Sequence, residues 1–317
     1  MDPRGPGGGG RAVRTVAILS GKDRRAEARG FTDRIGSALL IAKPGIGAGV
    51  AAAGLAGMVL GRAGVPDPGI LLVCLASILS AASGSAIVNG LLDAPMDARM
   101  PRLSGRVAAM GRVGTRGAAL LALVLIAAGL LLAHRYLNGT AALLLLAAVL
   151  SYTVLYTLCL KRRSPYGTIP GGIPGALPVL IGYSAVAGHV GLDGWILFLV
   201  MLLWQPPHFW ALALKHQDEY REAGVPVLPV ARGEPYTRVM IFVYAVALLP
   251  MSLALWAFGY CSPAFAGVAA VLWGLFLLAS YRNVVVRRRY GRAFGASIAY
   301  LMALLAALVL DITLRAL

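Results

Sequence analysis

Long runs of apolar residues recur along most of the chain, separated by short polar connections. Nine such runs cover residues 36–60, 70–90, 112–133, 139–160, 168–188, 194–214, 237–258, 262–282 and 293–314. A helix of about 20 apolar residues is long enough to cross the hydrocarbon core of a bilayer. The pattern therefore predicts an all-α polytopic membrane protein with nine transmembrane helices.

The first part of the chain has a different character. Residues 1–34 are rich in glycine and arginine and contain no long apolar run, so we expect a flexible cytosolic tail before a transmembrane domain over residues 35–317. The apolar core of a secretory signal peptide is missing. An organellar targeting segment stays open as an alternative, although Asp23, Glu27 and Asp33 argue against it.

The positions of the basic residues set the orientation. With the N-terminus in the cytosol, only Arg62, Arg135 and Arg315 of the 29 Lys and Arg lie on the outer side. Such an excess on one side is the pattern that orients membrane proteins. The net charge of +16, in a chain that is 59% hydrophobic, therefore indicates membrane topology and no role in nucleic-acid binding.

The first motif with candidate functional residues comes after the second apolar run, at Asn89-Gly-Leu-Leu-Asp93-Ala-Pro-Met-Asp97. The spacing keeps Asn89, Asp93 and Asp97 near one face of a helix. Two neighbouring carboxylates near a membrane suit Mg²⁺ together with phosphate oxygens. Pro95 predicts a bend or an end of the helix there. The alternative is a pair of solvated aspartates in a loop.

A basic pair, Lys161 and Arg162, comes directly after the fourth run. These residues either anchor the helix on the cytosolic side or bind phosphate, for which an ammonium and a guanidinium are well suited. The next helix begins with the glycines and prolines of residues 171–178, which allow either close helix packing or room for a flat ligand.

The sixth run contains His208 and leads into a second acidic pair, Asp218 and Glu219. A histidine inside a span is usually a packing residue, and contact with a substrate or a tetrapyrrole is the alternative hypothesis.

These motifs together resemble the UbiA superfamily of intramembrane prenyltransferases, and in detail its haem O synthase (protoheme IX farnesyltransferase) branch. The resemblance rests on Asn89-xxx-Asp93-xxx-Asp97-xx-Met100-x-Arg102, on Tyr156-Thr-x-x-Leu-Lys161-Arg162, on Gly171-Gly172-Ile-Pro-Gly175, and on Pro206-Pro207-His208-Phe-Trp210 with the later Tyr220-x-x-Ala-Gly224. It covers residues 36–314, and it implies a nine-helix UbiA-type bundle.

The resemblance implies transfer of the farnesyl group of farnesyl diphosphate to a vinyl group of haem b, with water addition, forming haem O and diphosphate. It also implies a role for each candidate residue, with Mg²⁺ as the cofactor. Asp93, Asp97 and Asp218 are the expected metal ligands, with Glu219 as an alternative in the second acidic motif. Arg102, Lys161 and Arg162 are expected to bind diphosphate. Asn89, Tyr156 and His208 complete the expected catalytic set, with His208 contacting the haem.

The expected partners are farnesyl diphosphate, haem b and the lipid bilayer, and association with a haem A synthase or a terminal oxidase assembly is a further expectation. The expected location is the inner (plasma) membrane of a bacterium, with the mitochondrial inner membrane as the alternative. A UbiA-type enzyme acting on an aromatic acid or a chlorin is the second hypothesis for function. A transporter is disfavoured because the charges lie toward one surface.

Overall fold

The structure, a computed structural model, describes residues 33–317. Within them nine helical segments are long and apolar enough to cross a membrane, as predicted. Six are single α-helices, namely α2 (Pro44–Arg62), α3 (Pro68–Asp97), α5 (Thr115–Tyr136), α8 (Leu192–Lys215), α11 (Glu234–Ala257) and α13 (Tyr290–Arg315). The other three combine two elements each: α6 (Gly139–Leu150) with η2 (Ser151–Leu160), η3 (Pro170–Gly172) with α7 (Ile173–Ala187), and α12 (Pro263–Ser280) with η4 (Tyr281–Val286). Of the tail predicted over residues 1–34, residues 1–32 lie outside the described part.

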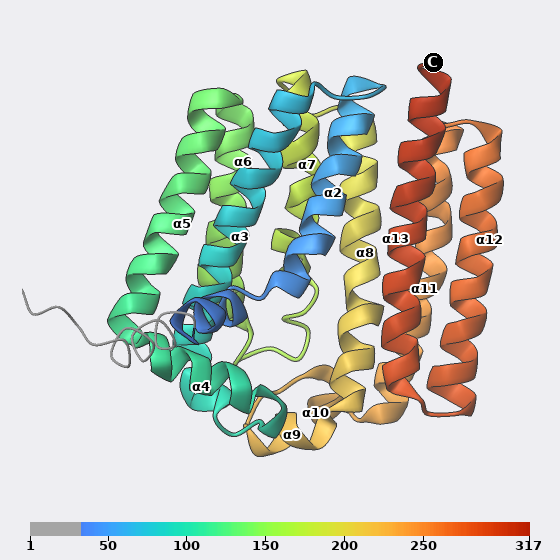
Figure 1. Cartoon of the computed structure of the whole chain (residues 1–317). Helices are drawn as coiled ribbons and strands as arrows, with labels where there is room; N and C mark the ends of the chain where they lie inside the picture. The colour runs from blue at the N-terminus through green and yellow to red at the C-terminus, as the bar shows by residue number, and fades with distance from the viewer. Residues whose placement is uncertain (1–32) are drawn as a thin grey trace, which may run out of the picture.

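The long helices form one bundle in which neighbours run in opposite directions, with α3, α5 and α6 on one side and α11, α12 and α13 on the other (Figure 1). The closest pairings join α3 with α5, α2 with α7, and α8 with α11. Three short helices cover one end of the bundle: α4 (Ser104–Val113), α9 (Gln217–Glu222) and α10 (Leu228–Arg232). This end also carries the C-terminal ends of α3, η2 and α8, so the motifs from the sequence meet there.

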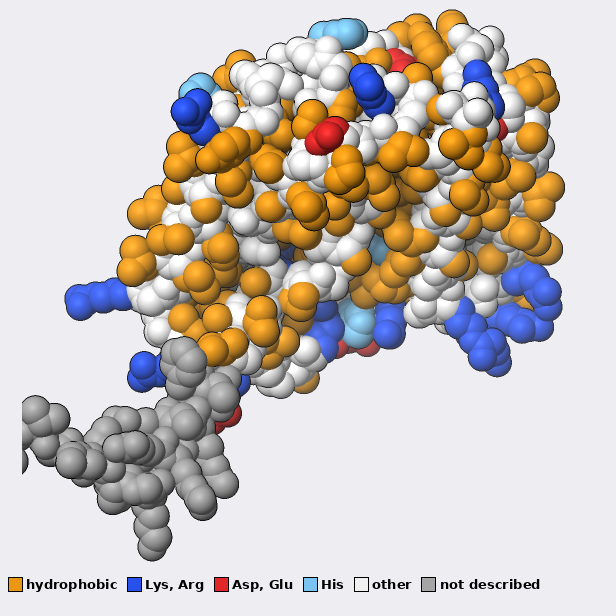
Figure 2. Space-filling view, turned by 45° about the horizontal axis from the view of Figure 1, so that its top comes forward, with side chains coloured by type: hydrophobic (Ala, Val, Ile, Leu, Met, Phe, Trp, Pro, Cys, Tyr) orange, Lys and Arg blue, Asp and Glu red, His pale blue; other side chains and the backbone are white. Residues whose placement is uncertain are grey.

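The outer surface agrees with a multi-pass membrane protein. Hydrophobic side chains cover its flank, and Lys and Arg side chains gather at its rim (Figure 2). Five of the exposed basic residues lie between the end of α12 and the first turn of α13, namely Arg282, Arg287, Arg288, Arg289 and Arg292. Basic residues at such a rim favour contact with anionic lipid headgroups.

The first predicted span differs from the structure. Residues 33–41 are helical, but the helix breaks at Lys43, which has φ 55° and ψ 62°, before α2 begins at Pro44. The break has a local cause, because proline disfavours the right-handed helical conformation in the residue before it. By contrast, α3 continues through Pro95 and ends at Asp97, so the acidic residues are all helical.

The packing of α2 against α7 (Ile173–Ala187) is the tightest in the bundle core. A Cβ atom on Gly57 would lie 2.0 Å from the carbonyl oxygen of Val179, and one on Gly182 would lie 2.0 Å from that of Gly54. In a membrane, where lipid is as apolar as the helices, such backbone contact is a main source of helix association.

This contact predicts a position-specific effect in α2. Gly57→Ala should destabilise the protein by about 1–3 kcal/mol, the usual effect of overpacking. Gly49→Ala is the matched control, since no atom of residues 33–317 lies within 4 Å of a Cβ at that position of the same helix. Thermal unfolding of the purified protein in detergent compares the two variants, and equal midpoints would contradict the close contact.

Candidate active site

An apolar cavity of about 320 Å³ opens at the end of the bundle where the motifs meet. Its walls come from α2, α3, α6, α7 and α8, and include Ile78, Ala81, Leu145, Val149 and Ile181. Its mouth is polar and is lined by Lys43, Asn89, Asp97, Arg102, Arg106 and Lys161. A charged mouth above an apolar interior is suited to a ligand with an anionic head and a hydrocarbon tail.

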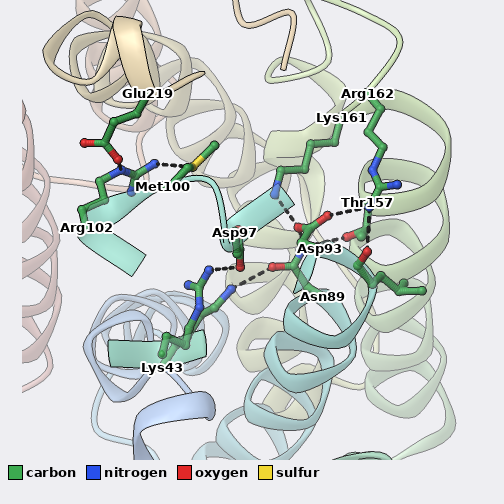
Figure 3. Close-up of polar contacts among 12 residues, drawn as sticks. Lys43, Asn89, Asp93, Asp97, Met100, Arg102, Thr157, Lys161, Arg162 and Glu219 are labelled. Carbon is green, nitrogen blue, oxygen red and sulfur yellow. Dashed lines mark hydrogen bonds and ion pairs between the residues drawn. The ribbon is translucent and has the colours of Figure 1, made fainter. Parts of the chain in front are cut away.

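The last turns of α3 supply the first acidic motif. Asp93 and Asp97 are 0% and 4% exposed, and Asn89 donates a hydrogen bond of 2.7 Å from its Nδ2 to Asp93 Oδ2 (Figure 3). The same amide donates to Thr157 Oγ1 at 3.2 Å. The alternative of solvated loop aspartates is therefore wrong, because both carboxylates are buried on a helix.

The predicted basic pair holds Asp93 in place. Lys161 Nζ pairs with Asp93 Oδ2, while Arg162 lies 3.4 Å from Asp93 Oδ1 and donates to the carbonyl oxygen of Leu92 at 2.6 Å. Both cations come directly after η2, the π-helical segment Ser151–Leu160, whose last turn is closed by the amide of Lys161 on the carbonyl of Tyr156 at 2.8 Å. Contact with a buried carboxylate makes these residues more than a topological anchor.

Two further cations belong to the site and were missed from the sequence. Arg106, on α4, pairs with Asp97, and Lys43 donates to Asn89 Oδ1 at 2.8 Å. Burial, reinforced by the positive charges of Arg106 and Lys161, lowers the pKa of Lys43 to about 7. The Lys-Pro pair at the start of the first span was the available signal, because a charge at that depth is costly without a partner.

The second acidic motif contributes Glu219 to the site. Glu219 Oε2 lies 3.1 Å from Arg102 Nε, and its Oε1 lies 2.9 Å from His216 Nδ1. Asp218 is 87% exposed, and its one ion pair within residues 33–317 is with Arg221, one turn along the same short helix. The structure therefore brings Glu219, and not Asp218, to the mouth of the cavity.

Two tyrosines of η2 form part of the cavity wall. The rings of Tyr152 and Tyr156 stack with centroids 6.1 Å apart. Gly171 makes room for Tyr156, since a Cβ there would lie 2.4 Å from its Cδ2 atom. The glycines at the start of the fifth span thus accommodate side chains of the protein itself.

His208 lies beside the cavity and is not one of its lining residues. Its ring is stacked between Trp204 and Phe294, at centroid distances of 4.4 and 4.3 Å, and Nδ1 lies 2.8 Å from Ser297 Oγ. Its neighbour Phe209 does line the cavity. The face of α8 that carries His208 is turned toward α13.

The charges at the mouth do not balance. In the part of the chain that the structure describes, five basic side chains (Lys43, Arg102, Arg106, Lys161 and Arg162) surround three carboxylates (Asp93, Asp97 and Glu219). Within residues 33–317, no three His, Cys, Asp or Glu side chains lie close enough to hold a metal ion by themselves. The mouth is therefore equipped for an anion, and a metal ion there would need ligand oxygens from that anion.

Comparison with known proteins agrees with this geometry. Residues 50–301 match the model of the UbiA prenyltransferase family. A protein named protoheme IX farnesyltransferase, from Geotalea uraniireducens, is 55% identical over 259 residues, which is 81% of this chain and all of that protein.

Two solved structures share the fold. One, of digeranylgeranylglyceryl phosphate synthase, has a TM-score of 0.72 at 17% identity and covers 88% of this chain and 98% of the other. The second is a UbiA homologue from Archaeoglobus fulgidus bound to GPP and Mg²⁺, with a TM-score of 0.62 at 15% identity, covering 86% and 99%.

The chain belongs to the UbiA prenyltransferase family. It is accordingly a membrane-embedded enzyme that transfers a prenyl group, and the cavity with its charged mouth is its candidate active site.

The two residues of the second acidic motif should differ in their effect on activity. Glu219→Gln removes a charge beside Arg102 and should lower prenyl transfer by at least about tenfold, as expected when a positioned charge is lost from an active site. Asp218→Asn changes only an exposed carboxylate and should leave the rate nearly unchanged. Initial rates of the two purified variants test this, and the reverse order would assign the role to Asp218.

Proposed function

We propose that this prenyltransferase transfers the farnesyl group of farnesyl diphosphate to a vinyl group of protohaem IX and adds water, the reaction of a protoheme IX farnesyltransferase. The observation that carries the proposal is the mouth of the cavity, where, within residues 33–317, four cations (Arg102, Arg106, Lys161 and Arg162) and the basic Lys43 surround three carboxylates above an apolar interior. The identity of 55% to a relative of that name over its whole length supports the choice of substrates.

The diphosphate is the anion that the mouth would bind. Arg102, Lys161 and Arg162 would receive it, together with Lys43 and Arg106, and would stabilise the charge that develops when the allylic C–O bond breaks. A guanidinium matches phosphate oxygens in pairs, and lysine acts as a point charge. The farnesyl tail would lie among the apolar side chains deeper in the cavity.

The residues fit Mg²⁺ bound together with the diphosphate. Asp93 and Asp97 offer oxygen donors one turn apart, Asn89 adds an amide oxygen, and Glu219 lies on the facing segment. Mg²⁺ typically takes one or two carboxylates and completes its shell with phosphate and water. When bound, it would supply Lewis-acid stabilisation of the leaving group. The chain's own part is to hold the carboxylates at the mouth and to neutralise them with cations.

The tyrosine pair would face the developing allylic cation. Aromatic faces attract positive charge, and Tyr152 and Tyr156 both line the cavity. The apolar walls exclude bulk water, which would otherwise capture the cation before the vinyl group could react.

The hydrogen bonding of the His208 ring supports a contact with the haem. Ser297 Oγ has one proton and donates it to the carbonyl of Phe294 at 2.6 Å, so Ser297 can only accept from His208 Nδ1. This fixes the proton on Nδ1 and leaves the lone pair of Nε2, for which no described residue is a donor. A histidine oriented through its other nitrogen is the usual form of a metal ligand. The haem would then lie at the side of the cavity next to Phe209.

We also propose that the N-terminus is cytosolic and that the protein resides in the inner membrane of a bacterium. Nine spans within residues 33–317 put the two ends of that segment on opposite sides, and the basic residues favour the end with the active site as the cytosolic one. Reporter fusions at both ends test this, and two reporters on the same side would contradict it.

The decisive experiment supplies purified protein with haem b, farnesyl diphosphate and Mg²⁺ and identifies the porphyrin product by mass. A product heavier than haem b by one farnesyl group and one hydroxyl group is expected. Transfer to an aromatic acid or a chlorin, with none to haem b, would reject the proposal.

Loss of a carboxylate from α3 should abolish most of this activity. Asp93→Asn and Asp97→Asn should each lower turnover by at least about a hundredfold, because the mouth would lose one of the negatively charged carboxylates that would bind the metal ion. Asp67→Asn is the control, since Asp67 caps the opposite end of α3, where asparagine caps equally well. Exhaustive chelation should likewise stop turnover, and activity that survives it would exclude the metal.

Removal of the imidazole at position 208 should affect the binding of haem but not the binding of farnesyl diphosphate. His208→Ala should weaken haem binding and change the haem absorption spectrum, while the affinity for farnesyl diphosphate stays nearly constant. His189→Ala is the control, because His189 is an exposed residue at the other end of the bundle. An unchanged spectrum and haem affinity would leave His208 as a packing residue.

A further inference from the structure

Gln205 presents an oriented amide to the cavity. It lies on α8 one turn before Phe209, is 4% exposed and belongs to the cavity wall. Its Nε2 donates to the carbonyl oxygen of Gly172 at 2.6 Å and lies 3.4 Å from that of Met201. The donor end of the side chain is therefore occupied by backbone.

The orientation of the amide is set by these contacts. An amide rotated by half a turn would set its oxygen against the carbonyl oxygen of Gly172, and two acceptors repel. Oε1 consequently points the other way, and no residue within 33–317 donates a hydrogen bond to it. Gln205 Oε1 is not among the fully buried polar atoms that lack a partner, so it is accessible from the cavity, where a ligand with a hydrogen to donate can reach it.

Two glycines make room for this side chain. A Cβ on Gly175 would lie 2.7 Å from Gln205 Oε1, and one on Gly172 would lie 3.3 Å from Nε2. Any larger residue at position 175 would push the amide from its place. The glycine-rich start of the fifth span thus fits Gln205 as closely as Gly171 fits Tyr156.

Neither organic substrate of the proposed reaction has a hydrogen-bond donor for Gln205 Oε1. The farnesyl group has no polar hydrogen, the pyrrole nitrogens of haem are bound to iron, and its propionates and the diphosphate are acceptors at neutral pH. The remaining substrate of the proposed reaction is water, which has two donors. We propose that Gln205 Oε1 holds the water molecule that completes the reaction, an inference that rests on the proposed function.

The addition of water conserves atoms and electrons. The vinyl π electrons form a C–C bond to C1 of the farnesyl group as the C1–O bond breaks, and the diphosphate leaves with that electron pair. Positive charge remains on the vinyl carbon attached to the porphyrin. A lone pair of the water held by Gln205 forms the C–O bond at this carbon, and the released proton passes to the diphosphate. Without a positioned water, the cation instead loses a proton and gives an alkene.

The test measures the products of Gln205→Met, which keeps the length of the side chain and removes the acceptor. The ratio of hydrated product to the product lighter by one water molecule should fall about threefold to tenfold, the effect of one hydrogen bond. Gln217→Met is the matched control, since Gln217 also donates to a carbonyl, at 2.9 Å to Pro229, but lies outside the cavity. It should keep the wild-type ratio.

Binding of farnesyl diphosphate to Gln205→Met establishes that the variant is folded. If it is not, Gln205→Asn replaces it, because the shorter amide withdraws its oxygen and should give the same change in ratio. A wild-type ratio in the folded variant would overturn the inference and leave the proposed function standing. A wild-type enzyme that makes no farnesylated haem would instead remove the proposed function.

Discussion

The structure depends on keeping two carboxylates charged at the edge of a membrane. Asp93 and Asp97 are buried, and an unpaired buried charge is costly enough to disrupt the helix that carries it. Each therefore has a cation from another element, Lys161 from the end of η2 and Arg106 from α4. These contacts fix how α3, η2 and α4 meet, and they leave the cavity beneath them apolar.

Glycines determine how closely the remaining elements approach this centre. Between α2 and α7 they bring backbones into contact, whereas Gly171 and Gly175 leave space that Tyr156 and Gln205 fill. The same residue type thus serves helix association in one place and the shape of the cavity wall in another. In both places the absence of a side chain allows close packing, and this packing offsets the low helix propensity of glycine in a chain that has 39 of them.

The sequence predicted the nine spans because length and hydropathy decide them, and it predicted Asp93, Lys161 and their neighbours because a charge at the end of an apolar span is costly without a partner or a ligand. It did not reveal Lys43, whose partner Asn89 lies on another helix. It could not choose between Asp218 and Glu219. Adjacent residues of a helix point in different directions, and the sequence does not say which of the two directions faces Arg102. The rotation of α8 about its own axis decides whether Gln205 and His208 face the cavity. The hydrophobic periodicity of a uniformly apolar helix does not specify this rotation.

The π-helical segment η2 has a consequence for how this chain can change in length. Its wider turns end with the amide of Lys161 on the carbonyl five residues earlier, so the segment holds more residues per turn than an α-helix. Deleting one residue from η2 would let it return to ordinary helical turns with little rotation of the residues that follow, whereas the same deletion in α6 would rotate them by about 100°. Only the deletion in α6 would move Lys161 and Arg162 away from Asp93, while the hydropathy of the span would stay almost the same in both cases. Two deletions that a membrane-insertion signal could not tell apart would therefore differ in whether they dismantle the mouth of the cavity.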